Sequence, residues 1–324
     1  MAKKTAGFDI GGRGIHIAVT GRKGIKRIVN LILPEGMVRD GRIISYEAMG
    51  DFIREAVKKQ KLRVHQAAVV LPSSQCFCRR LSMPVMSHEQ LMVNIPYEFR
   101  DFITAEKDEY YYDYAVLKTT TDDDGMVQGL DLMAAAALKD TIEDYRVMFR
   151  RAGLKLKTVV PLEMAYGNML SRADVDHCHC LIDLGHYAVR LYMYNGSAFE
   201  TSHTIEYGCN ALDSAIAEAL HIDPFVAATY REANHDNCQS LPECMQIYQN
   251  LALEIQKAIY FFRYNSPDAE LEHIHLIGGG AGIQPLRDTL VNTLSIPIAD
   301  AAEIFDVDGI DIEYGLCAAG AALQ

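Results

Sequence analysis

The sequence predicts an α/β protein with two lobes of related structure. Its 324 residues suffice for about two domains. One motif occurs twice: an aspartate, a glycine two residues later, and aliphatic residues or methionine six, eight and ten residues after the aspartate. The copies begin at Asp9 and Asp183, so 183 − 9 = 174 residues separate them, more than half of the chain. Segments with helical and strand periodicity follow each copy in alternation.

The composition is that of an ordinary globular protein. Apolar residues make up 49% of the chain and charged residues 23%, which excludes a disordered or low-complexity chain. The net charge of −12 argues against a protein whose main task is to bind nucleic acid or an anionic membrane surface. Residues 1–6 lead into the first motif without the apolar segment of a signal peptide. Because we interpret the eight cysteines as reduced thiols, we expect a cytoplasmic protein.

The repeated motif predicts one β-hairpin in each lobe. Each copy has a strand that ends in the aspartate, a tight turn at Gly11 or Gly185, and a second strand whose apolar side chains recur with period two. Two equivalent hairpins that each carry one aspartate predict two similar lobes that face each other.

The segments after the hairpins have the patterns of helices and strands. The helical ranges are 45–61, 212–220, 241–262, 284–294 and 314–323, and the strand ranges are 66–71 and 273–277. The strand at 273–277 leads into Gly278, Gly279 and Gly280 and then into a helix, an arrangement that is typical of phosphate and nucleotide sites.

One stretch interrupts this alternation and predicts an inserted α+β subdomain. It contains a helix that opens with the capping box Ser87 to Gln90, strands at 110–118 and 129–137, and a helix at 141–152. We therefore expect a first-lobe core of residues 1–76 with 152–175, an insert of 77–151, a second-lobe core of 176–210 with 272–324, and a helical subdomain of the second lobe at 211–271.

Together, the two hairpins, the glycine turn and the small-residue helix at 314–323 resemble the actin-like ATPase superfamily, whose two lobes are RNase-H-like. In the insert and directly after it, segments 81–84, the capped helix, 113–117 and 152–154 resemble the subdomain shared by the PilM and FtsA families. The sequence lacks the linker and amphipathic membrane helix that follow the last core helix in FtsA, so it is more similar to PilM, the cytoplasmic actin-like family of type IV pilus assembly.

This resemblance implies that ATP and Mg²⁺ bind between the lobes. The first phosphate motif of the family corresponds to Asp9, Gly11 and Gly12, and the second corresponds to Asp183 and Gly185. The adenosine motif of the family corresponds to Gly278, Gly279, Gly280 and Arg231. Glycine turns offer backbone N–H groups to phosphate oxygens, and a pair of carboxylates suits a hydrated Mg²⁺ ion.

Several positions depart from the family pattern. Glycine and Arg13 replace the small hydroxyl residues of the first phosphate motif. His16 replaces a lysine of the family pattern, and Arg13 is a candidate to supply the positive charge of that lysine. In many of these ATPases a polar residue orients the attacking water, and the corresponding position here is Val160, which offers no polar group. Glu163 is close in the sequence, but helical periodicity places it on a different side of the helix from that position. Arg231 replaces a further lysine near the adenine. We therefore expect weak or absent ATP hydrolysis.

The resemblance also implies a partner. PilM-like proteins bind the N-terminal cytoplasmic tail of PilN, an inner-membrane protein, in a groove between the insert and the first lobe. Strands at 77–83 and 110–118 are candidates for the edge that binds such an extended peptide, and membrane association would be indirect, through the partner, at the inner face of the cell membrane. A small-molecule kinase and an FtsA-like cell-division protein are the alternatives. A kinase would need a further carboxylate as general base.

Two other segments have possible roles in binding. Strand alternation places the two histidines and two cysteines of residues 177–180 on opposite faces, so we expect no metal site beyond the Mg²⁺ bound with nucleotide. The tyrosine-rich run at 110–114 is either a partner surface or an ordinary strand whose side chains alternate between inside and outside.

Overall fold

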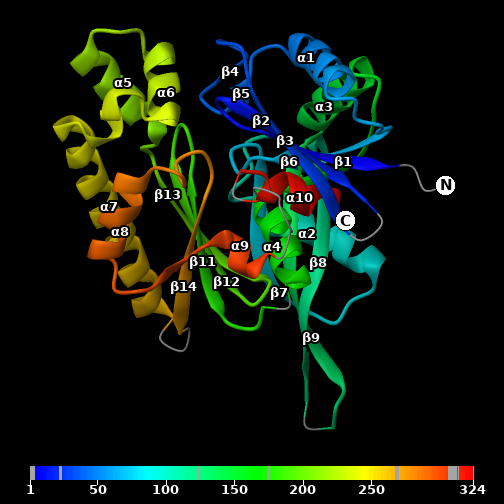
Figure 1. Cartoon of the computed structure of the whole chain (residues 1–324). Helices are drawn as coiled ribbons and strands as arrows, with labels where there is room; N and C mark the ends of the chain where they lie inside the picture. Colours follow the sequence, from blue (N-terminus) through cyan, green and yellow to red (C-terminus); the bar gives the residue numbers. More distant parts are fainter. Residues whose placement is uncertain are drawn as a thin grey trace.

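The computed structural model describes residues 4–21, 24–122, 124–173, 175–266, 270–305, 312 and 314–323. Two five-stranded sheets lie on either side of a shared centre, and a smaller sheet extends from the first of them (Figure 1). Both predicted hairpins are present, as strands β1 (Thr5–Ile10) and β2 (Gly14–Thr20), and β11 (Cys178–Leu184) and β12 (Val189–Asn195).

The two large sheets have the same topology. The first has the order β10-β6-β1-β2-β3, with β1 antiparallel to β2 and parallel to β6. The second has the order β13-β12-β11-β14-β15, in which β11 is antiparallel to β12 and parallel to β14. The remaining strands of both sheets are β3 (Ile25–Ile32), β6 (Gln66–Leu71), β10 (Lys155–Pro161), β13 (Ala198–Ile205), β14 (Leu271–Ile277) and β15 (Ile298–Ala299). The duplication and the α/β fold class predicted from the repeated motif are therefore confirmed.

Helices cover the outer face of each sheet. Against the first sheet pack α1 (Tyr46–Lys59) and α3 (Lys139–Arg151), and Phe8 of β1 meets Phe149 of α3 with ring centroids 5.0 Å apart. Against the second pack α5 (Cys209–Leu220), α7 (Pro242–Asn265) and α8 (Gln284–Thr293), with α6 (Pro224–Ala233) beside α5. The short elements are β4 (Val38–Arg39), β5 (Arg42–Ile43), η1 (Lys107–Glu109), η2 (His235–Ser240) and α9 (Ala301–Ile304).

Two helices fill the space between the sheets. Side chains of α4 (Leu162–Arg172) and α10 (Leu316–Ala322) share one buried cluster with Ala18 of the first sheet and Tyr192 of the second. The close approach needs small residues, because a Cβ atom at Gly320 would lie 1.8 Å from the carbonyl oxygen of Ala165 in α4. The small residues of α10 thus allow this helix to pack closely against α4 between the two lobes.

The inserted sheet has the order β7-β9-β8, from strands β7 (Cys76–Pro84), β8 (Tyr110–Thr121) and β9 (Val127–Leu138). Helix α2 (His88–Glu98) packs on it and begins with the predicted capping box at Ser87. The β8–β9 hairpin extends well beyond the rest of the molecule (Figure 1).

One element differs from the expected division of the chain. The insert was expected to include helix α3, but its side chains Tyr145, Met148 and Phe149 are buried in the core cluster of the first lobe. The amphipathic pattern of a helix shows that one face is buried, not which neighbour buries it. We therefore propose that the insert ends at Leu138.

Within the part of the chain that the structure describes, no helix combines the length and the apolar character needed to cross a lipid bilayer.

The packing of α10 makes a testable prediction for stability. Gly320→Ala should lower the free energy of unfolding by about 1–3 kcal/mol or more, because the added methyl group meets backbone atoms of α4 that cannot move aside independently. Urea unfolding followed by circular dichroism measures this difference. Gly279→Ala is the matched control, since a Cβ atom there has no neighbour within 4 Å. Equal loss of stability in both variants would contradict the close packing.

Candidate functional site

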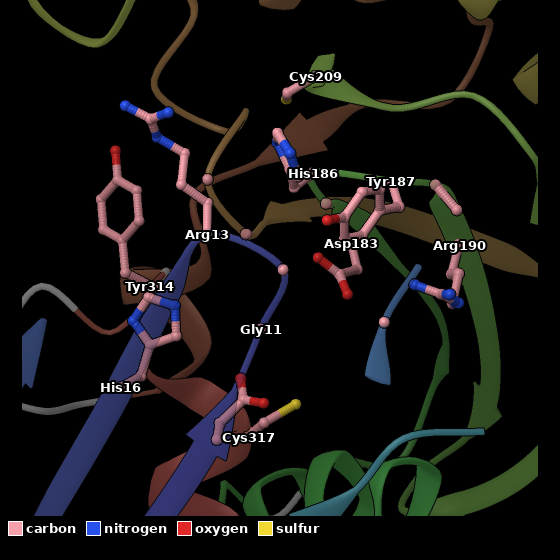
Figure 2. A pocket seen from close by; sticks show the side chains of 18 of the residues that line it. Gly11, Arg13, His16, Asp183, His186, Tyr187, Arg190, Cys209, Tyr314 and Cys317 are labelled. Carbon is pink, nitrogen blue, oxygen red and sulfur yellow. The ribbon is translucent and has the colours of Figure 1, made fainter. Parts of the chain in front are cut away.

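A cavity of about 850 Å³ lies between the lobes, at the ends of strands β1, β11 and β14. Figure 2 shows residues from both lobes around it, with Gly11 and His16 from the first hairpin and Asp183 and Arg190 from the second. Eight of the nine predicted site residues line this cavity: Asp9, Gly11, Gly12, Asp183, Gly185, Arg231, Gly278 and Gly279. The tertiary structure thus brings together segments that lie far apart in the chain.

The two repeated aspartates are partly buried at the wall of the cavity, and their charges interact. The pKa of Asp183 is raised to about 7, chiefly by burial and also by the negative charge of Asp9, while Arg190 and a hydrogen bond with Tyr166 oppose the shift. Burial also raises the pKa of Asp9, and the neighbouring His16 opposes that shift. In both cases the ionised carboxylate lacks enough compensating positive charge. A divalent cation between the lobes would supply it, so the donor set fits Mg²⁺.

Each hairpin also presents a basic residue beside its aspartate. Across the antiparallel pairs, His16 is the partner of Asp9 and Arg190 is the partner of Asp183. The sequence offset is the same in both copies, since 16 − 9 = 7 and 190 − 183 = 7. Arg190 was missed in the sequence, although this repeated offset could have found it. The Nδ1 atom of His16 lies 2.8 Å from Oδ1 of Asn30, which orients the imidazole.

The glycine turn after β14 has two distinct parts. Gly278 has φ +87°, and a Cβ atom there would lie 2.3 Å from Oδ1 of Asp183, so only glycine lets this turn approach that carboxylate. Gly280 does not line the cavity, contrary to the prediction of an adenosine contact for all three glycines. Its N–H donates to the carbonyl of Leu184 at 2.9 Å, and its Cα faces the thiol of Cys209. Gly280 therefore fastens the turn to β11.

Arg231 lines the cavity, but its charge is already paired. The side chain is buried, and its Nε donates to Oδ1 of Asp213 in α5 at 2.6 Å. Its carbonyl accepts from Nε2 of Gln239 at 2.7 Å. The other oxygen of Asp213 lies 3.7 Å from Nδ1 of His186, whose pKa is lowered by burial. Arg231 thus joins α5 and α6 at the wall of the cavity, and only part of it remains free to contact a nucleotide.

Arg13 crosses from the first lobe to the second. Its Nε donates to Oε1 of Glu232 at 3.0 Å, a second nitrogen donates to Oγ1 of Thr229 at 3.2 Å, and the guanidinium lies 4.8 Å from the ring centroid of Phe225. All three partners are in α6. In this conformation Arg13 bridges the lobes and does not supply the charge of the missing lysine near His16.

Neither Val160 nor Glu163 reaches the cavity. Val160 is fully buried, and Oε1 of Glu163 accepts a hydrogen bond from Oγ of Ser73 at 2.7 Å. The carboxylate of Glu163 is therefore held by Ser73 and does not line the cavity.

The segment 177–180 lies in the second sheet. Cys180 belongs to the apolar core, and Nδ1 of His179 lies 3.4 Å from Nε2 of His275 on the adjacent strand. Among the residues described, no group of three or more His, Cys, Asp or Glu side chains is arranged to bind a metal ion. The tyrosine-rich run follows the strand pattern, because Tyr110 is buried and Tyr111 is exposed.

Two duplicated sheets that enclose a cleft with one aspartate from each hairpin define the actin-like ATPase class of proteins. The chain matches the family described as "Type IV pilus assembly protein PilM" over residues 7–308. It therefore belongs to the PilM family, and neither the kinase nor the FtsA-like alternative is favoured. A search among curated proteins gave no match.

Solved structures of low sequence identity share the fold. The structure described as "PilM-PilN type IV pilus biogenesis complex" has a TM-score of 0.82 and 19% identity, with 98% of this chain and 97% of that chain covered. The ethanolamine utilization protein EutJ from Carboxydothermus hydrogenoformans has a TM-score of 0.61 and 15% identity, with coverages of 100% and 90%. MreB5 of Spiroplasma citri bound to ADP has a TM-score of 0.51 and 13% identity, with coverages of 99% and 95%.

The bridge made by Arg13 predicts a measurable effect on the motion of the lobes. Arg13→Ala should speed amide hydrogen exchange in α6 and in the turn at 11–14 about fivefold, which corresponds to the loss of roughly 1 kcal/mol from a partly exposed ion pair. Arg54→Ala is the matched control, because Arg54 pairs with Asp51 within α1. Unchanged exchange in α6 of the Arg13 variant would show that the contact does not tie the lobes together.

Proposed function

We propose that the protein is an ATP-binding, actin-like scaffold of type IV pilus assembly, and that its insert binds the N-terminal cytoplasmic tail of a PilN-like inner-membrane protein. Membership of the PilM family supports the assembly role. A solved structure of a PilM–PilN complex covers 98% of this chain, which includes the insert. The protein would work in the cytoplasm, held at the inner face of the membrane through this partner.

The observation that favours the insert as the docking module is its edge strand. β8 pairs with β9 on one side and is the terminal strand of the three-stranded sheet. Tyr111 and Val116 of β8 are 48% and 50% exposed. An extended peptide gains affinity by pairing with such an edge and by placing apolar side chains against exposed ones. Strand β7 is the opposite edge, but Cys76 at its start is buried in the first lobe's core.

Point variants in β8 test this docking. Tyr111→Ala should weaken binding of a PilN-like tail peptide from the same genome by about tenfold, since loss of one interface aromatic residue costs roughly 1–2 kcal/mol. Fluorescence anisotropy with the full protein measures the affinity. Tyr264→Ala in α7 is the control, because Tyr264 is also exposed but lies in the other lobe. Equal affinities of both variants and the parent would place the site elsewhere. Deletion of 77–151 is a poor test, since it removes α3 from the core.

We further propose that the cleft binds an adenine nucleotide with Mg²⁺. Asp9 and Asp183 would hold the cation directly or through its water ligands, and the backbone N–H groups of the turns after them would bind phosphate oxygens. Gly278 and Gly279 would adjoin the nucleoside, beside the wall formed by α6. The cation's role is to neutralise phosphate and carboxylate charge. The position of Glu163 favours binding over hydrolysis, because its carboxylate accepts a hydrogen bond from Ser73 and does not line the cavity.

Calorimetric titration with ADP and ATP in the presence of Mg²⁺ tests nucleotide binding. We expect binding to strengthen by about tenfold from pH 6 to pH 8, because Asp183, with a pKa of about 7, must lose its proton to hold the cation. Asp183→Asn should weaken Mg²⁺-dependent binding and remove this part of the pH dependence. Asp176→Asn is the control, since that carboxylate is exposed on the surface. No heat of binding with either nucleotide at millimolar concentration would overturn the proposal.

A further inference from the structure

A strongly basic surface lies at the end of the first sheet that is opposite the cavity. Strands β1, β6 and β10 begin at this end, near the N label in Figure 1, and β3 begins there beside the end of β2. Helix α1 ends there as well, because Arg27 of β3 donates to the carbonyl oxygen and Oε1 of Gln60, the C-cap of α1, at 3.0 and 2.7 Å. Nine exposed cations belong to these ends, and we call them the basic face: Lys4, Lys26, Arg27, Lys58, Lys59, Lys61, Arg63, Lys155 and Lys157.

Backbone hydrogen bonds hold these segments side by side. The carbonyl oxygen of Lys4 accepts from the N–H of His65 at 3.2 Å, and the carbonyl oxygen of His65 accepts from the N–H of Lys155 at 3.0 Å. Four intervals separate β10 from β3 in the sheet, so at about 4.8 Å each the basic face is about 19 Å wide. A surface of this width exceeds a single phosphate group and matches a partner that presents many negative charges.

The charges of the basic face are not compensated within the protein. The segments that carry them contain no aspartate or glutamate: 4–6, 24–28, 58–66 and 153–158. Within the described ranges none of the nine cations forms an ion pair with a carboxylate, whereas Arg13, Arg80 and Arg231 all do. The C-terminus of α1 accounts for Lys58 and Lys59, which favour the helix dipole, but the other seven cations lie outside that helix. The basic face is therefore available to an external partner.

The charge of the chain is divided unevenly between this face and the rest of the molecule. Without the nine cations, 31 − 9 = 22 basic residues remain against 43 acidic ones. The net charge of the remainder is 22 − 43 = −21, compared with −12 for the whole chain. An anionic surface therefore repels the rest of the molecule and attracts the basic face, which sets one orientation of approach.

We infer that the basic face binds the anionic headgroups of a lipid bilayer. Seven of its nine cations are lysines, and its segments contain no Phe, Tyr or Trp. Surfaces that bind nucleic acid rely more on arginine and on aromatic side chains that stack on bases. A cluster of lysines without aromatic residues instead fits the diffuse negative charge of a membrane leaflet. The inference rests in part on the proposed function, which places the protein at the inner face of the membrane.

The lipid contact acts together with the partner's tail. The net charge of −12 keeps lipid binding weak by itself. A tail bound to the insert raises the local concentration of lipid beside the protein, so the two weak contacts strengthen each other. None of the nine cations lies in the insert, so the tail and the lipid occupy different surfaces.

Co-sedimentation of the full protein with vesicles tests the inference. The parent should bind vesicles of phosphatidylglycerol and phosphatidylcholine at least about tenfold more tightly than vesicles of phosphatidylcholine alone. The preference should disappear in about 1 M salt, where the Debye length falls to about 3 Å. Reversal of three cations from separate segments should reduce binding to the anionic vesicles at least about tenfold: Lys26→Glu, Arg63→Glu and Lys155→Glu in one variant.

The control variant has the same net charge as this triple variant. It carries Arg100→Glu, Lys118→Glu and Arg263→Glu, at exposed positions in the insert and in α7. Each reversal changes the charge by −2, so both variants have a net charge of −12 − 6 = −18. The control should bind the anionic vesicles much as the parent does, because its basic face is intact. Thermal unfolding verifies that both variants are folded.

The outcomes separate this inference from the proposed docking of the tail. Equal binding of the parent to both kinds of vesicle would overturn the inference, and so would equal losses in the two triple variants. Binding of duplex DNA by the parent, without binding of anionic vesicles, would assign the basic face to nucleic acid instead. The vesicles contain no partner, so each of these results leaves the tail-docking proposal standing. Loss of tail binding alone would overturn that proposal and leave the basic face as a lipid contact.

Discussion

The partial burial of two like charges in one cleft is the constraint on which the rest of the cleft depends. Asp9 and Asp183 lie one residue before the ends of the central strands of equivalent sheets, and each is partly buried at the wall of the cavity. Two ionised carboxylates in such a place need positive charge nearby. Each hairpin supplies one basic partner, His16 or Arg190, which does not restore an ordinary pKa. Because these basic partners do not fully compensate the two carboxylates, a cation between the lobes would be stabilised.

The lobes are joined in two ways that differ in strength. At the base, α4 and α10 are packed against both sheets with backbone atoms in close contact, so this junction tolerates little movement. At the mouth, single side chains cross the cleft: Arg13 reaches α6, and Tyr187 reaches Gly12. These contacts can break singly without exposing a core. Tight helix packing on one side of the cleft and single side-chain contacts on the other are the arrangement expected of a cleft that opens to admit a ligand.

Continuous packing also links the cleft with the insert. Phe8 precedes Asp9 in β1 and packs against Phe149 of α3, the helix that directly follows β9. Strand β9 is the partner of the edge strand β8. The first hairpin and the insert are therefore joined by a continuous path of packed side chains and paired strands. The assignment of α3 to the first lobe makes this link, and the helical pattern of residues 141–152 alone did not reveal it.

The sequence alone predicts the duplicated hairpins, the fold class and eight of the residues that line the cavity. A repeat with period-two alternation is a local signal, and equal offsets from each aspartate place equivalent residues at equivalent sites. The directions of the Arg13 and Tyr187 side chains depend on the tertiary structure. So do the pairing of Arg231 with Asp213 and the hydrogen bond by which Gly280 holds its turn against β11. Their partners lie in the opposite lobe or at least 18 residues away in the chain. Local propensity carries no information about such contacts, which arise when packing of the cores brings the two lobes together.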